Sequence, residues 1–144
     1  MALATTLAEL RRMLAAVPFA RRYGFKLTAI GDGTCTLVVP FRRELERPGG
    51  IVAGPVLMAA ADVAVWLAIL TRLGAADGSV TINLNTAFLA AVRREEFRCE
   101  AVVLRVGRRV VYAAATCLTK NDEIVAHHTA TYARPARVTA AVSP

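Results

Sequence analysis

The most apolar segment of the chain covers residues 50–70 and contains a single charged residue, Asp62. Its apolar side chains occupy every side of a helix, which is the pattern of a helix enclosed all round. Pro55 suits the first helical position, and Gly74 suits the residue after the last turn. The pattern therefore predicts a helix from about Pro55 to Leu73, roughly 28 Å long.

Strand-like runs predict six strands around this helix. Two of them flank Gly31-Asp32-Gly33, whose residues tolerate a positive φ, and predict a hairpin within residues 24–41. A short amphipathic helix precedes the hairpin, starting at the capping-box spacing of Thr6 and Glu9 and ending near Pro18. The four remaining runs follow the long helix, at residues 79–89, 97–106, 109–118 and 123–133, and residues 134–144 are predicted to be frayed.

This order of elements predicts an α+β fold in which one antiparallel sheet packs on the long helix. No linker or repeat divides residues 1–144, so we expect a single domain. One sheet covers only one side of a helix that is apolar all round. A second copy of the chain is the simplest cover for the other side, which predicts a homo-oligomer.

A membrane span is the main alternative for the apolar segment, because Ile51 to Leu70 is long enough to cross a bilayer. Asp62 near its centre would cost about 2.5–3.5 kcal/mol on insertion. A span would also separate the first hairpin from the other four strands. We therefore expect a core helix and no membrane association.

Charge and cysteine content bear on the partners and the cellular location of the protein. The net charge is +7 and 16 of the 18 basic residues are Arg, but the Arg residues occur as scattered pairs. Nucleic-acid binding usually concentrates charge on one arm or helix, so no nucleic acid is expected as a partner. The three cysteines lack CxxC spacing, and the N-terminus lacks the apolar core of a signal peptide. These features predict buried free thiols and a cytoplasmic location.

Taken together, these elements resemble the hotdog-fold acyl-CoA thioesterases, in particular the phenylacetyl-CoA thioesterase-like branch. The resemblance is carried by RPGGIVAGPVLMAAADVA at residues 47–64, VPFARRYGFKL at 17–27 and VTINLNTAFL at 80–89, and it extends to the closing hairpin. It implies a sheet wrapped around a central helix. It also implies a homodimer or homotetramer with active sites at the subunit interface.

The resemblance assigns roles to several residues. The family carries His-Gly-Gly at the start of the central helix and an acid nine residues after the His. Those positions are Ala53-Gly54-Pro55 and Asp62 here, so the acid and the Gly are present and the His is not. An upstream Asn of many members corresponds to Arg47, and a Ser or Thr on the next strand corresponds to Thr81.

The chemistry of these residue types fits the assignment. A carboxylate in an apolar pocket, as expected for Asp62, suits a general base or a nucleophile, and the alternative is a structural hydrogen bond across a dimer interface. The N–H of Gly54 could stabilise an oxyanion, and the alternative is a helix cap. Thr81 could orient water or be an ordinary strand residue. Strict alternation places it on one strand face with Asn83 and Asn85.

Substrate contacts follow from the same picture. Ala53, Met58 and Trp66 are candidates for the acyl pocket. The candidates for the coenzyme phosphates are Arg47, Arg108 and Arg109.

Metal and cofactor motifs are missing from the sequence. His127 and His128 point to opposite faces of a strand and are interpreted as structural, so no metal and no cofactor is predicted.

Three functions remain open at this stage. The first is hydrolysis of acyl-CoA thioesters with Asp62 as base or nucleophile and the Gly54 N–H as oxyanion donor. The second is non-catalytic acyl-CoA binding, suggested by Ala53 and Arg47 in place of polar groups. The third is enoyl-CoA hydration, which would require an Asp-His pair.

Overall fold

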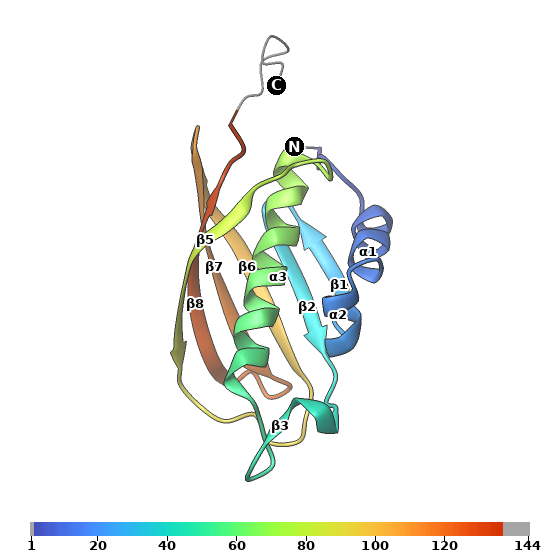
Figure 1. Ribbon diagram of the computed structural model, residues 1–144, viewed down its shortest axis with the longest axis vertical. Helices are drawn as coiled ribbons and strands as arrows, with labels where there is room; N and C mark the ends of the chain where they lie inside the picture. Colours follow the sequence, from blue (N-terminus) through green and yellow to red (C-terminus); the bar gives the residue numbers. More distant parts are fainter. Residues whose placement is uncertain (1, 137–144) are drawn as a thin grey trace, which may run out of the picture.

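A six-stranded antiparallel sheet wraps around one long helix in the computed structural model, which describes residues 2–136 (Figure 1). The strand order is β1-β2-β6-β7-β8-β5. The strands are β1 Lys26–Gly31, β2 Thr34–Val39, β5 Val80–Phe88, β6 Phe97–Val106, β7 Val110–Thr119 and β8 Ile124–Ala133. All six predicted strands are therefore present, and the hairpin turn between β1 and β2 lies at Asp32-Gly33 as expected.

The long helix α3 runs from Gly54 to Leu73, one residue longer than predicted. Pro55 lies in its first turn and Gly74 follows its last. The helix packs on β2, β6 and β7, and small residues such as Ala60 and Ala64, which have no exposed surface, allow it to approach the sheet closely. Although α3 is long and apolar enough to cross a membrane, 61% of its most apolar window is buried inside this fold, which accounts for its composition.

The N-terminal segment forms two helices where one was predicted. α1 spans Leu7–Ala15, and the Glu9 N–H donates to Thr6 Oγ1 at 3.1 Å, as the capping box predicts. Pro18 does not end the helical region; it opens a second short helix, α2 Pro18–Tyr23, which closes at Gly24 with φ +73°. Proline suits this position because the first helical N–H has no partner in any case. Both helices lie on the opposite side of α3 from β5 (Figure 1).

The loop before α3 also contains more structure than its polar sequence indicates. A 3-10 turn, η1 Arg43–Leu45, leads into a two-stranded ribbon of β3 Glu46–Arg47 and β4 Ile51–Val52. The Val52 N–H donates to the Val92 carbonyl at 2.8 Å, and the Ala53 N–H donates to the Leu45 carbonyl at 2.8 Å. These bonds fix the chain at the start of α3.

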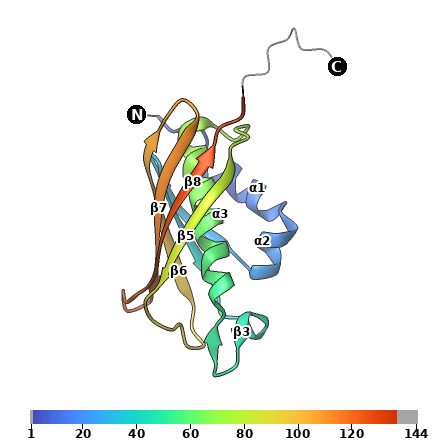
Figure 2. The ribbon, with the colours of Figure 1, turned by 60° about the vertical axis from the view of Figure 1, so that its left-hand side comes forward.

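Strand β5 is an edge strand of the sheet (Figure 2). It has a β-bulge near its beginning. Thr81 lies opposite Tyr132 of β8, but the next ladder pair is Asn83 with Thr131, so Ile82 has no partner. The bulge reverses the alternation and puts Thr81 on the inner face and Asn83 on the outer face. The prediction that Thr81, Asn83 and Asn85 share one face is therefore wrong, because it assumed an unbroken period of two.

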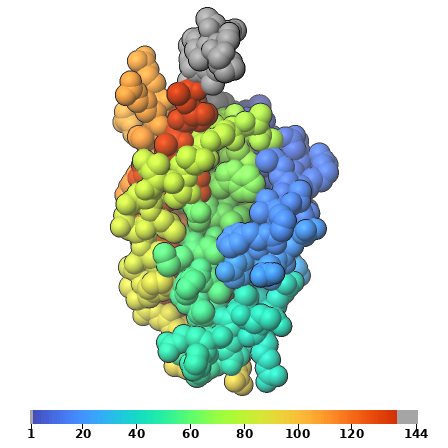
Figure 3. Space-filling view, viewed as in Figure 1, coloured from blue at the N-terminus to red at the C-terminus, as the bar shows by residue number. Residues whose placement is uncertain are grey.

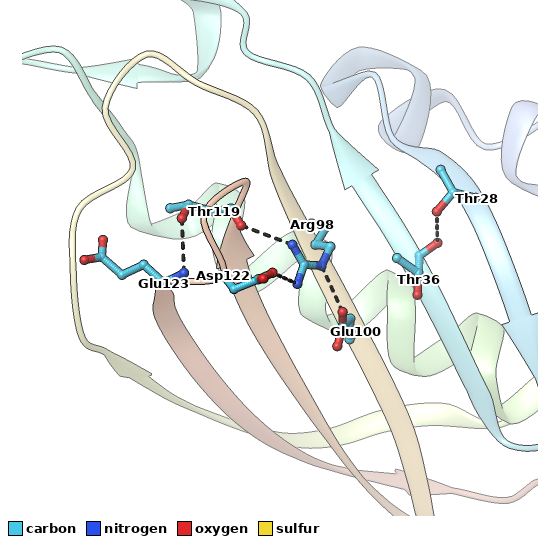
Figure 4. A network of polar contacts seen from close by, with 7 residues as sticks. All are labelled: Thr28, Thr36, Arg98, Glu100, Thr119, Asp122 and Glu123. Atoms are coloured by element: carbon cyan, nitrogen blue, oxygen red, sulfur yellow. Dashed lines mark hydrogen bonds and ion pairs between the residues drawn. The ribbon is translucent and has the colours of Figure 1, made fainter.

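One arginine on the outer face of the sheet links β6 to the β7–β8 turn (Figure 4). Arg98 on β6 donates to Glu100 Oε1 at 2.9 Å, to the Thr119 carbonyl at 3.1 Å and to Asp122 in the β7–β8 turn. Asp122 has a positive φ of 63°, a conformation that costs energy in a non-glycine residue. Hydrogen bonds from Glu100 and Asp122 raise the pKa of Arg98.

All three cysteines, Cys35, Cys99 and Cys117, are buried free thiols, as the sequence predicts. Burial raises the pKa of Cys35 to about 12, so this thiol stays neutral at physiological pH. Strand β8 ends at Ala133. Residues 137–144 of the segment predicted to be frayed lie outside the described residues.

Candidate active site

Asp62 lies at the middle of α3 and is held by two hydroxyl groups. Thr81 Oγ1 on β5 donates to Asp62 Oδ1 at 2.7 Å, and the Tyr132 hydroxyl on β8 donates to the same oxygen at 2.6 Å. Thr81 and Tyr132 are cross-strand neighbours, so the sheet sets both donors side by side. The site thus joins one helix to two adjacent strands.

Tyr132 was missed by sequence reasoning, although one signal was available. A tyrosine among the inward positions of a strand buries its hydroxyl, and a buried hydroxyl needs a partner. Here Tyr132 is 3% exposed, and its hydroxyl also contacts the main-chain carbonyl of Asp62 at 2.8 Å. Burial, with the nearby charge of Asp62 as a further cause, raises the pKa of Tyr132, so this group remains a hydrogen-bond donor at neutral pH.

The second carboxylate oxygen of Asp62 has a different environment. Oδ2 accepts no hydrogen bond from residues 2–136. Within the same range, the buried side-chain oxygens without a partner are those of Thr5 and Ser79, and Oδ2 is not among them. Oδ2 is therefore accessible from outside the chain, while Oδ1 is fixed from within. One oriented and accessible carboxylate oxygen is what a general base or a nucleophile requires.

The surroundings of Asp62 on α3 are apolar and only partly covered. Met58, Asp62 and Trp66 are spaced by one helical turn, and all three are half-buried, as are Ala59 and Val63. Figure 3 shows α3 at the surface between β5 and the two N-terminal helices. An uncovered apolar stripe around a carboxylate is suited to an acyl group and to a second protein surface.

Gly54 is the first residue of α3, about two turns before Asp62. Its N–H has no side-chain cap, and Pro55 provides no N–H beside it. Gly54 lines a cavity of about 380 Å³ together with Arg47 and Phe88. A Cβ built on Gly54 would lie 3.2 Å from the Phe88 ring, so the absence of a side chain lets that ring approach the helix terminus.

Gly54 and Asp62 are widely separated within one chain for two groups that would act on the same carbonyl group. They are eight residues apart on one helix, which is about 12 Å along its axis. An oxyanion donor lies about 3 Å from the oxygen, and an attacking carboxylate about 3–3.5 Å from the carbon, so in direct attack the two groups are at most about 8 Å apart, and a water activated by the carboxylate extends this to about 10–11 Å. This spacing favours a site in which the two groups come from different chains.

The remaining predicted substrate residues fall into two places. Ala53 is the residue that precedes α3, and it is half-buried beside Gly54. Arg108 and Arg109 lie in the β6–β7 turn and line a separate cleft with Arg134. The structure thus places Arg47 with Gly54, whereas it does not bring the Arg108-Arg109 pair to either Gly54 or Asp62.

The two histidines occupy opposite faces of β8, as predicted. His127 is exposed and contacts Thr116 Oγ1 at 3.1 Å. His128 is 1% exposed and contacts Thr86 Oγ1 through Nδ1 at 2.8 Å. Neither contacts Asp62. Across residues 2–136, no group of three or more His, Cys, Asp or Glu side chains is arranged to hold a metal ion.

Comparison with known proteins identifies the family to which the chain belongs. The model of the thioesterase superfamily matches residues 49–126, which is more than half of the chain and includes Gly54, Asp62 and Thr81. A Thermoplasma acidophilum protein that carries the name "putative esterase" is 26% identical over 86% of this chain and 93% of its own length.

Solved structures agree on the architecture. A thioesterase from Haemophilus influenzae has a TM-score of 0.87 at 19% identity, over 99% of this chain and 100% of its own. The phenylacetic acid degradation protein PaaI from Thermus thermophilus, solved as a mutant, has a TM-score of 0.75 at 22% identity, over 83% of this chain and 100% of its own. The chain therefore belongs to the thioesterase superfamily, and its architecture is the hotdog fold of that family.

Proposed function

We propose that this chain hydrolyses acyl-CoA thioesters at a site formed by two copies of the chain. Membership of the thioesterase superfamily supports thioester hydrolysis as the reaction class. The observation that carries the finer assignment is the Asp62 carboxylate, with Oδ1 held by Thr81 and Tyr132 and Oδ2 accessible. Asp62 either activates water or attacks the thioester carbon itself.

The second copy supplies the oxyanion donor. Among residues 2–136, strand β5 has no neighbour on its outer edge, and its side chains Val80, Ile82 and Phe88 are all more than half exposed. An exposed apolar edge strand is a template for pairing with another strand. Two-fold pairing of β5 with its counterpart would bring a second α3 alongside, and the Gly54 N–H of that copy could then approach Asp62.

The other substrate groups follow from this arrangement. Met58 and Trp66 flank Asp62 on the uncovered stripe of α3 and form the acyl pocket. Arg47 shares the cavity of Gly54, which supports a contact between its guanidinium group and a coenzyme phosphate. The role of Arg108 and Arg109 in phosphate binding stays a prediction. The buried free thiols support a reducing compartment such as the cytoplasm.

A thiol-release assay with aryl, short-chain and medium-chain acyl-CoA tests the proposal directly. We expect saturable thiol release with at least one class. Saturable binding without thiol release across all three would instead identify a non-catalytic acyl-CoA binder, the function suggested by Ala53 in place of a polar residue. Hydration of an enoyl thioester is not supported, because no His among residues 2–136 contacts Asp62.

Tyr132→Phe tests whether the second hydroxyl positions the carboxylate. Removal of this donor is expected to lower kcat about tenfold with little change in KM, because Asp62 Oδ1 keeps Thr81 alone. The free energy of unfolding should fall by about 1–2 kcal/mol. Steady-state kinetics and urea denaturation measure the two effects. Tyr112→Phe, on the exposed face of β7, is the matched control and should change neither. If the two variants have the same kcat and KM, Tyr132 does not position the Asp62 carboxylate.

A further inference from the structure

A second cavity lies under the N-terminal helices, on the other side of α3 from β5. It has a volume of about 570 Å³ and is bounded by α1, α2, the start of β1 and Arg42. Its floor is formed by the buried side chains of Leu14, Ala20, Phe25 and Leu27. A volume of this size is typical of small-molecule sites, and an apolar floor binds an apolar body.

The rim of this cavity carries only positive charge. Arg11, Arg21, Lys26 and Arg42 line it, and no acidic residue does. None of the ion pairs formed within residues 2–136 includes any of these four side chains. Four cations around one cavity repel each other and create a positive potential there, which a bound anion would relieve.

Two of these cations are fixed without being neutralised. Arg11 Nε donates to the Leu27 carbonyl at 2.9 Å, and one terminal nitrogen of Arg42 donates to the Arg22 carbonyl at 2.9 Å. A main-chain carbonyl orients a guanidinium group but carries no net charge. The remaining N–H groups stay available, and a guanidinium presents them in the planar fork that fits a carboxylate.

We propose that this cavity, the α1–α2 cavity, binds a monocarboxylate with a small apolar body, such as a medium-chain or arylalkanoic acid. The carboxylate contacts the guanidinium rim at Arg11 and Arg42, and the apolar body rests on Leu14 and Phe25. The site is complete within one chain and includes neither Asp62 nor Gly54. It therefore does not depend on the proposed hydrolysis, and an Asp62→Asn variant should bind the same acid equally well.

Titration of the ¹⁵N-labelled full chain with octanoate tests the site by NMR. Saturable shifts are expected at the amides of Ala15, Gly24 and Leu27, which line the cavity. Octanamide has the same apolar body without the charge, and inorganic phosphate has charge without the body, so both should bind at least about tenfold more weakly. Raising the salt concentration should weaken octanoate binding.

Paired variants locate the contact. Arg11→Gln should weaken octanoate binding about tenfold, whereas Arg12→Gln, an exposed neighbour outside the cavity, should not. Ala15→Phe fills the cavity from its exposed rim without removing a charge, and it should also abolish the shifts. Equal binding by Arg11→Gln and Arg12→Gln, unchanged binding by Ala15→Phe, or shifts confined to residues around Gly54 and Asp62 would each overturn the proposal.

Discussion

Asp62→Asn is expected to lower kcat for acyl-CoA hydrolysis about a thousandfold and to leave the fold intact. Asn keeps an acceptor oxygen, so Thr81 and Tyr132 can still donate to it as they do to Oδ1. It loses the negative charge on the accessible oxygen, and with it the capacity to take a proton or to attack the thioester carbon. KM should change only a few-fold, because the amide has nearly the same shape.

The measurement pairs thiol-release kinetics with a thermal melt of the same preparation. Asp32→Asn is the matched control, because Asp32 lies in the exposed β1–β2 turn and forms its ion pair with Arg72, at 3.3 Å. That variant should retain the turnover of the parent. If Asp62→Asn folds normally and turns over substrate at the parental rate, Asp62 has a structural role alone.

Mixing two inactive variants is expected to restore activity if each site draws on two chains. Asp62→Asn removes the acid, and Gly54→Pro removes the N–H at the start of α3 and should lower kcat about a hundredfold. Half of randomly mixed dimers contain one chain of each kind, and each of these has one intact site. The mixture should therefore reach about a quarter of parental activity.

The Gly54→Pro variant needs a control for the side-chain atoms that it adds. A Cβ on Gly54 would lie 3.2 Å from the Phe88 ring, which is 53% exposed and has room to move. Gly54→Ala adds that Cβ and keeps the N–H, so it should retain most of the activity. Native mass spectrometry verifies that chains have exchanged. Exchange without recovered activity would show that Gly54 and Asp62 do not act across two chains.

The fold could be predicted from the sequence because its strongest signals are local. The apolar segment with Pro55 and Gly74 at its ends specified α3 to within one residue, and the alternating runs specified six strands. The elements that were missed, α2 and the β3–β4 ribbon, are short. Their stability comes from packing and from hydrogen bonds to distant residues, such as Val52 to Val92, which no local pattern encodes.

The site was predictable only in part. Asp62 stood out because a lone acid in an apolar segment is costly, and Thr81 followed from the family resemblance. The contact between Thr81 and Asp62 depends on the bulge at Ile82, because unbroken alternation along β5 would turn Thr81 to the outer face together with Asn83. Tyr132 lies 70 residues from Asp62 in sequence. Its role is set by the pairing of β5 with β8, which becomes known only once the sheet is built.

The unpaired residue Ile82 divides β5 into two parts. The alternation of inward and outward side chains is set separately in each part. The part before it orients Thr81 toward the Asp62 carboxylate, and the part after it continues the pairing with β8. Insertions in the loop at residues 74–79 would leave both parts undisturbed. If the bulge closed so that Ile82 paired with Tyr132, Thr81 would move opposite Ala133 and turn outward, while every later pair survived. The hydrogen bond to Asp62 and the main register of the sheet therefore depend on different parts of the same strand.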